Sequence, residues 1–195
     1  MESFGSDRPP FNFQNHLQGR LRDARTLMLN EALTAAVAGQ VAEQLTLLDT
    51  EAAEPISVLM RNAPGGNVDA GLSTYDLLRS LASPVTMLGS GRIAGAGVLA
   101  FLGAPSGRRF ALPHVRFRLE EPREALEKRT TGDAAERADV ARDRRARIVP
   151  LLADATGRPV AQADEDLSAQ RAFTAEEAVA YGLIERVVES RSEVM

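Results

Sequence analysis

Short apolar runs alternate with segments of helical spacing along most of this chain. Three of the runs have the length of a buried strand: residues 26–29, 56–60 and 84–88. A helical segment follows each of them: from the candidate N-cap Thr34 through Leu48, over about residues 68–82, and over the small residues 96–103. Strands that alternate with helices favour right-handed crossover connections and a mainly parallel sheet. The pattern therefore predicts an α/β fold.

Later segments add shorter strands and one long charged helix. Strands are predicted over residues 109–112, 115–119 and 183–188. Residues 133–156 are helical in composition and heavily charged, so we expect this helix to project from the sheet or to cap it. Pro150 should bend or interrupt the helix, because proline removes a backbone donor and clashes with the preceding turn.

Cap and turn residues mark the ends of several elements. Thr174 and Glu177 form a capping box at the start of a short helix, and Gly182 ends that helix. Glycine-rich turns are predicted over residues 64–66 and 89–97, each after a strand. Backbone N–H groups at such turns can point at a developing negative charge, which is the geometry of an oxyanion hole. The plainer interpretation is a tight strand-to-helix connection, and neither turn has a complete phosphate-binding motif.

The composition is that of a globular protein with one domain. The chain has 195 residues, 44% of them hydrophobic and 26% charged, which is enough to form one sizeable core. Its net charge of -4 gives no basic field for a nucleic-acid backbone. The absence of cysteine excludes disulfides, thiolate metal sites and a cysteine nucleophile. Since no signal-like segment and no apolar run of about 18 residues occurs, we expect a cytoplasmic protein without a membrane partner.

We expect the chain to have three parts. Residues 1–24 mix prolines, glycines and charges without steady periodicity, which is typical of a flexible arm. Residues 25–190 form the domain, and residues 191–195 form a C-terminal tail.

Five blocks of the sequence resemble the ClpP family, the proteolytic subunits of ATP-dependent Clp proteases, in both order and spacing. The blocks read ISVLMRNAPGGNVDAGLSTY, PVTMLGSGRIAGAG, GRRFALPHVRFRLEEP, TGRPVAQADED and FTAEEAVAYGLIERV. Together they represent about residues 25–190 of the chain. The resemblance implies a ClpP/crotonase-like fold and descent from serine proteases that use a triad of Ser, His and Asp.

Two of the three triad positions are changed. The family's nucleophile lies in a G-x-A-A-S-M-G stretch, which here covers residues 91–97 with Gly95 in place of the serine. The family's base lies in L-P-x-x-x-x-x-I-H-Q-P, which here begins at Leu112 with Glu120 in place of the histidine. The orienting aspartate corresponds to Asp166. Glycine has no side chain that attacks a carbonyl, and a carboxylate poorly replaces imidazole. The resemblance thus implies an inactive, ClpR-like subunit.

A peptidase with a rearranged active site is one alternative. Ser90 would then be the nucleophile, but it lies on the far side of a glycine turn from the family position. His114 lies six residues before Glu120, about 20 Å away along an extended strand. Lys128, the only lysine, falls in the segment that forms the inter-ring handle of the family, where a solvated or interface charge is the simpler interpretation.

An acyl-CoA enzyme of the crotonase family is the second alternative. Gly66 and Ala96 match the residues that supply the oxyanion N–H groups in ClpP, and crotonases stabilise an enolate with two such groups. Glu120 or Glu121 would then serve as acid or base. Adjacent residues on a strand face opposite ways, so only one of them could point into the site.

The resemblance also implies the partners. We expect heptameric rings formed by this chain alone or with catalytic ClpP paralogues, a Clp ATPase as a further candidate partner, and neither cofactor nor metal. In the handle, residues 122–129 replace a glycine-rich strand of the family with charged residues and helix formers. We therefore expect ring stacking to depend on charge pairs more than on strand pairing.

Overall fold

A computed structural model describes residues 13–120 and 134–195 of the chain. Within this part, seven strands form one sheet: β1 (Thr26–Leu29), β2 (Ile56–Ala63), β3 (Val85–Ala94), β4 (Arg109–Ala111), β5 (Arg116–Arg118), β6 (Ala172–Phe173) and β7 (Arg186–Val187). The helices are α1 (Phe13–Asp23), α2 (Ala35–Glu51), α3 (Val68–Ser80), α4 (Ala96–Phe101), α5 (Ala134–Thr156), α6 (Val160–Ser168) and α7 (Ala175–Tyr181), with single turns of 3₁₀-helix at Ser106–Arg108 and Arg191–Glu193.

The sheet is mainly parallel, as the sequence predicts. Its main path runs in the order β1-β2-β3-β4-β7, and all neighbours on this path are parallel. Strand β5 pairs in parallel with the last part of β3, and β6 pairs antiparallel with β5. The carboxyl ends of β3 and β5 therefore lie side by side, which is where ligands bind in open α/β sheets.

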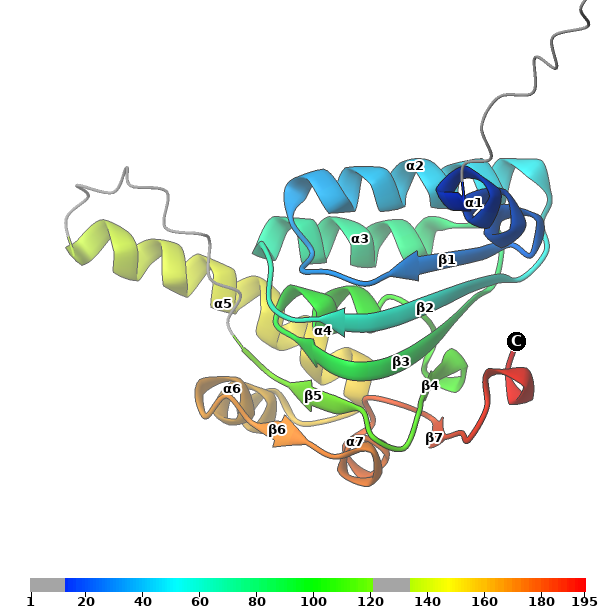
Figure 1. Cartoon of the computed structure of the whole chain (residues 1–195). Coiled ribbons are helices and arrows are strands. Elements are labelled where there is room, and N and C mark those ends of the chain that lie inside the picture. The colour runs from blue at the N-terminus through cyan, green and yellow to red at the C-terminus, as the bar shows by residue number, and fades with distance from the viewer. Residues whose placement is uncertain (1–12, 121–133) are drawn as a thin grey trace, which may run out of the picture.

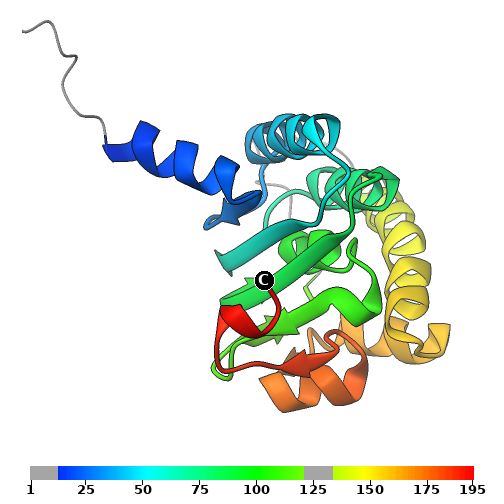
Figure 2. The ribbon, with the colours of Figure 1, turned by 90° about the vertical axis from the view of Figure 1, so that its right-hand side faces the viewer.

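Helices cover one side of the sheet. Figure 2 shows α2, α3, α4 and α5 on the same side of the strands, with α6 and α7 below them. The core lies between these helices and the sheet, where Leu45, Ile56, Phe101 and Ile148 are fully buried. Figure 1 shows the first half of α5 extending beyond the sheet, as the charged composition of that helix predicts.

Several predicted signals have the expected structural role. Thr34 caps α2 by accepting a hydrogen bond from the N–H of Val37. Thr174 and Glu177 form both hydrogen bonds of the capping box, and Gly182 ends α7 in the left-handed conformation. None of the helices in the described ranges is long and apolar enough to cross a membrane.

Two predictions were wrong. Residues 89–94 do not form a turn but continue β3, because β2 and β4 pair with Gly89 on its two sides and supply its backbone partners. Pro150 does not interrupt α5, which continues through it to Thr156. The proline itself is exposed, whereas Ile148, Val149 and Leu152 are buried and hold the helix against the core.

The sequence pattern did not indicate three further elements. These are α1, which occupies residues assigned to the N-terminal arm, α6 and the two-residue strand β6. The final strand, predicted over residues 183–188, is confined to Arg186–Val187. Residues 1–12 and the handle residues 122–129, Lys128 among them, lie outside the described residues.

Candidate functional site

Gly95 stands at the junction between β3 and α4. Ala94 is the register partner of Arg118 on β5, and the N–H of Gly95 donates to the carbonyl of Arg118 over 3.3 Å. Gly95 is also the N-cap of α4, where its carbonyl accepts from the N–H groups of Val98 and Leu99. The strand thus turns directly into the helix at the position where the resemblance expects a nucleophile.

The backbone of Gly95 has φ 53° and ψ −120°. Side chains of L-amino acids rarely adopt this conformation, and residues other than glycine that do so store strain. Glycine relieves that strain, and it leaves no functional group at the turn. The local geometry of a strand–turn–helix elbow is therefore present without a side chain to react.

The glycine turn after β2 lies against this elbow. The N–H of Gly65 donates to the carbonyl of Ala94 over 3.1 Å, and the N–H of Asn67 donates to Leu33 over 3.0 Å. Gly66 lies between these two hydrogen-bonded residues and has a φ of 120°. A Cβ at this position would stand 2.4 Å from the Leu33 carbonyl oxygen. Only glycine fits this close approach, so the sequence positions the Gly66 peptide beside the elbow.

Ala96 is the first residue of α4. Its N–H has no partner within the helix, because the first turn of a helix leaves its donors unsatisfied. The two peptide groups that the sequence analysis assigned to an oxyanion hole thus belong to turns that are joined directly to each other through the Gly65 to Ala94 hydrogen bond.

Glu120 follows β5 and is held by two arginines. Its Oε1 accepts from Arg92 Nη2 at 2.8 Å and lies 3.3 Å from Arg118 Nε. Both arginine side chains are partly exposed, at 54% for Arg92 and 42% for Arg118. Exposed ion pairs contribute little to stability individually. Both ion pairs use the same oxygen, Oε1, so they orient the carboxylate toward the two guanidinium groups.

A very small cavity joins two of the three triad positions. Gly95 and Glu120 both line it, and the rest of the lining is apolar: Val98, Leu99, Leu119, Ile148, Leu152 and Leu167. Its volume is about 10 Å³, which is the space of roughly one water molecule. Ile148 and Leu152 of α5 and Leu167 of α6 form its apolar wall.

Asp166 is buried near the end of α6 and forms its contacts with other partners. Its Oδ1 accepts from Arg171 Nη1 at 2.9 Å, and its Oδ2 accepts from Gln162 Nε2 at 3.1 Å. Burial works to raise the pKa of Asp166, but the hydrogen bonds from Arg171 and Gln162 outweigh it and hold the pKa below its usual range. Asp166 does not line the small cavity, although its neighbour Leu167 does.

Arg171 links Asp166 to an aromatic cluster. Its guanidinium lies 5.0 Å from the ring centroid of Phe173 and 5.5 Å from that of Tyr181, and Arg158 stacks on the Tyr181 ring at 5.2 Å. The Tyr181 hydroxyl is buried near Asp166 without a hydrogen bond of ordinary geometry. Burial and the nearby carboxylate raise the pKa of Tyr181. Sequence reasoning missed this cluster, since nothing in the local pattern marks Arg171 as the partner of Asp166.

The candidates for a rearranged site lie elsewhere. Ser90 is on β3 in register with Arg61, on the far side of Gly91 from the elbow. His114 precedes β5 and lies near Glu176 at the start of α7. Neither residue lines the cavity at Gly95. Within residues 13–120 and 134–195, no group of three histidine, aspartate or glutamate side chains is arranged to hold a metal ion.

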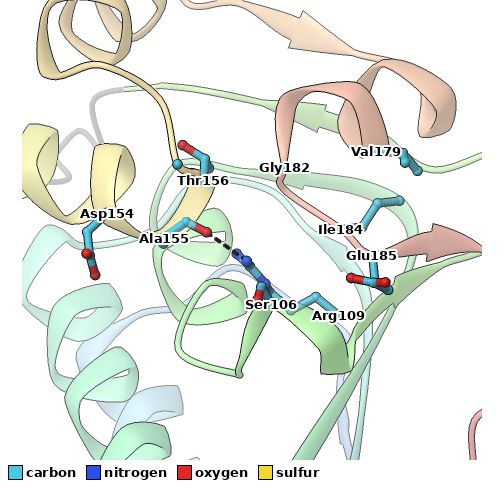
Figure 3. Close-up of a pocket in the computed structure, with 10 residues that line it drawn as sticks. Ser106, Arg109, Asp154, Ala155, Thr156, Val179, Gly182, Ile184 and Glu185 are labelled. Atoms are coloured by element: carbon cyan, nitrogen blue, oxygen red, sulfur yellow. Dashed lines mark hydrogen bonds between the residues drawn. The ribbon is translucent and has the colours of Figure 1, made fainter.

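A larger cavity of about 420 Å³ lies apart from the triad positions. Figure 3 shows the Arg109 side chain reaching the end of α5, where its Nη2 donates to the Ala155 carbonyl over 2.7 Å. Nε and Nη1 are buried and have no partner in the described part of the chain. Burial lowers the pKa of Arg109 to about 10. This arginine satisfies the carboxyl end of a helix, and none of Gly95, Glu120 and Asp166 lines its cavity.

Known proteins of one family match this chain. A model of the Clp protease family matches residues 12–191. The ATP-dependent Clp protease proteolytic subunit 1 of Streptomyces avermitilis is 34% identical over 188 residues, which is 96% of this chain and 86% of the relative. Proteolytic subunit 3 of Rhodococcus jostii is 33% identical over 186 residues, 95% of this chain and 92% of the relative.

A solved structure agrees with these sequence matches. ClpP1 from Listeria monocytogenes superimposes with a TM-score of 0.80 at 29% sequence identity, covering 92% of this chain and 99% of that chain. This chain therefore belongs to the Clp protease family.

Proposed function

We propose that this chain is a catalytically inactive Clp-type subunit with a structural or regulatory role in a protease ring assembly. The observation that carries the proposal is Gly95, which stands at the elbow between β3 and α4 with no side chain to attack a peptide carbonyl. Serine peptidases need a nucleophile activated by an adjacent base. Because Gly95 has no hydroxyl, the elbow supplies no nucleophile for such a reaction.

The other two triad positions support the same proposal. Glu120 is engaged with Arg92 and Arg118, and Asp166 is engaged with Arg171 and Gln162. In a working triad the base contacts both the nucleophile and the orienting carboxylate. Here each carboxylate forms an ion pair with an arginine instead, and the two carboxylates have different arginine partners.

The small cavity beside Gly95 does not favour a catalytic alternative. Its volume is about 10 Å³, and neither Gly66 nor Ala96 lines it, so it does not join the two candidate oxyanion-hole peptides to a space for a thioester. Glu120 would also have to leave two arginines before it could serve as an acid or base.

A role in assembly is the function that remains. Relatives described as proteolytic subunits of ATP-dependent proteases imply neighbours of the same fold, so we infer heptameric rings of this chain alone or mixed with catalytic paralogues, to which a Clp ATPase docks. The projecting half of α5 supports contact beyond the body of the subunit (Figure 1). We also infer that the protein is cytoplasmic, that it catalyses no reaction and that it binds no cofactor.

Native mass spectrometry tests this proposal, with peptide hydrolysis measured in the same samples. The chain is prepared alone, with a catalytic Clp subunit from the same cell, and with the purified catalytic subunit replaced by its serine-to-alanine variant. We expect rings in at least one of the mixtures and hydrolysis only where the intact catalytic subunit is present. Hydrolysis by the chain alone would overturn the inactive assignment, and monomers in every sample would overturn the assembly role.

A further inference from the structure

Four arginines share one face of the sheet near the degenerate site: Arg61 on β2, Arg92 on β3, and Arg116 and Arg118 on β5. Arg61 is in register with Ser90, and Arg92 is in register with Arg116. The register between β2 and β3 shifts just after Arg61, so the face of each arginine follows from its own strand neighbour. Met60, Ile93 and Phe117 are buried, and the arginines next to them point to the opposite side of the sheet. We call these four residues the arginine face.

The arginine face looks away from the helical layer. Phe117, between Arg116 and Arg118, is fully buried and packs edge-on against Phe101 of α4 with 5.2 Å between the ring centroids. Because successive strand residues alternate, Arg116 and Arg118 point to the opposite side of the sheet. Figure 2 shows α2, α3 and α5 on the same side of the sheet as α4, the helix that Phe117 contacts. The four guanidinium groups are thus not covered by that layer.

Few acidic groups neutralise this face. Arg92 and Arg118 share the single carboxylate of Glu120, while Glu176 lies near Arg116. Neither Arg61 nor Arg116 forms an ion pair within the part of the chain that the structure describes, although Arg116 Nη1 donates to the carbonyl of Val115. Among residues 13–120 and 134–195, these two carboxylates face four arginines, which leaves an excess of positive charge on this part of a protein whose net charge is -4.

We propose that the arginine face binds acidic segments of polypeptide. Guanidinium groups match carboxylates in planar two-pronged hydrogen bonds and are held here on rigid strands at fixed spacing. Arg61 and Arg116 supply guanidinium groups that form no ion pair in the described part of the chain, and Arg92 and Arg118 extend the positive surface to Glu120. This inference goes beyond the inactive-subunit proposal and does not depend on it, since an active subunit would present the same face.

The interaction is weak and sensitive to salt. Exposed charge pairs are individually weak, and screening shortens their range to about 3 Å at 1 M salt. The face therefore captures and steers acidic chains more than it holds them tightly. A high local concentration of such chains, as in an enclosed ring, would be needed to occupy it fully.

Fluorescence anisotropy of a labelled Glu-Gly repeat peptide tests the proposal on the full chain at low salt. The double variant Arg61→Gln with Arg116→Gln removes two charges that form no ion pair with Glu120. The matched control, Arg20→Gln with Arg79→Gln, removes two exposed charges from α1 and α3 instead. We expect the first variant to bind the peptide about fivefold more weakly, which corresponds to two exposed charge pairs, and the control to bind it as the wild type does.

Three results would overturn the proposal. They are no binding of the acidic peptide to the wild type, equal weakening in both variants, and competition by an oligonucleotide of the same charge at equal or lower concentration. A Lys-Gly repeat peptide should not bind, and high salt should abolish binding of the acidic one. Circular dichroism of both variants ensures that a loss of binding reflects the removed charges and not a loss of fold.

Discussion

Arg171 and Asp166 form an ion pair of 2.9 Å between the end of α6 and the start of β6. The same arginine also joins two elements, because its backbone carbonyl accepts from the N–H of Leu119 and its N–H donates to the carbonyl of Asp166. Asp166 therefore stabilises the connection between α6 and the end of β5. This structural task is independent of any role in catalysis.

Replacing Asp166 with Asn should destabilise the protein in a manner that depends on pH. The folded-state pKa of Asp166 is lowered, so its contribution is fully present above the unfolded pKa of about 3.9 and is lost as the pH falls through the folded value. We expect Asp166→Asn to lower the free energy of unfolding by about 1–3 kcal/mol at pH 7. The difference from wild type should shrink below about pH 4.

Urea unfolding across a pH series measures this effect. Asp139→Asn is the matched control, because Asp139 forms an ion pair with Arg142 on the exposed part of α5 and should contribute less than about 1 kcal/mol at any pH. If Asp166→Asn were as stable as wild type at pH 7, or if its deficit grew in acid, Asp166 would not have the structural role inferred here.

Gly95→Ser should destabilise the fold without restoring hydrolysis. The backbone at this position has φ 53° and ψ −120°, and a side chain held there costs about 1–3 kcal/mol. Gly107→Ser serves as the control, since a Cβ at Gly107 would meet no atom within 4 Å. Thermal unfolding together with hydrolysis of a fluorogenic peptide checks both parts. Substantial activity from Gly95→Ser alone would mean that the base has been assigned to the wrong residue.

The double variant Gly95→Ser with Glu120→His places all three triad residue types at the family positions. Asp166 remains bound to Arg171 and Gln162 in the structure, so it does not orient the new histidine. We expect activity about 10⁴-fold below that of a complete triad, the usual cost of a missing orienting carboxylate. The activity of the double variant is measured as its rate of peptide hydrolysis and is compared with that of a catalytic Clp subunit. Full activity would show that Arg171 releases Asp166 readily.

Local signals in the sequence predicted much of the scaffold. The strand at residues 26–29 and the caps at Thr34 and Thr174 were predicted correctly, because hydrophobic spacing and capping act within a few residues. The extension of β3 through Gly89 was not, since glycine favours turns locally and the pairing strands come from distant segments. Tertiary pairing overrides local propensity at that position.

The sequence also predicted only part of the candidate site, because the rest depends on contacts that form only in the folded chain. The resemblance pointed to Gly95, Glu120 and Asp166 as positions, and the backbone brings Gly95 and Glu120 to one cavity. The partners of the two carboxylates lie at separations of 28 residues for Arg92 and 5 residues for Arg171. No sequence rule selects these arginines among the many in the chain. The ion pairs of Glu120 and Asp166 could therefore be found only from the folded structure.

Ring stacking should respond to ionic strength. Residues 122–129, which lie outside the described residues, carry charges in place of the family's glycine-rich handle strand. Exposed charge pairs are weak individually and are screened by salt. We expect any double ring to dissociate toward single rings or smaller species as salt rises, as sedimentation velocity would reveal. A double ring of unchanged mass in high salt would mean that charge pairs in this segment do not hold the rings together.

Reaction with a fluorophosphonate probe tests the absence of a nucleophile most directly. The purified chain and a catalytic Clp subunit are incubated with the probe in parallel, and intact mass spectrometry followed by peptide mapping locates any adduct. We predict no adduct on this chain under conditions that label the catalytic subunit completely. An adduct on any residue of this chain would contradict the claim that the chain has no reactive nucleophile. Ser90 is the residue at which such an adduct should be sought first.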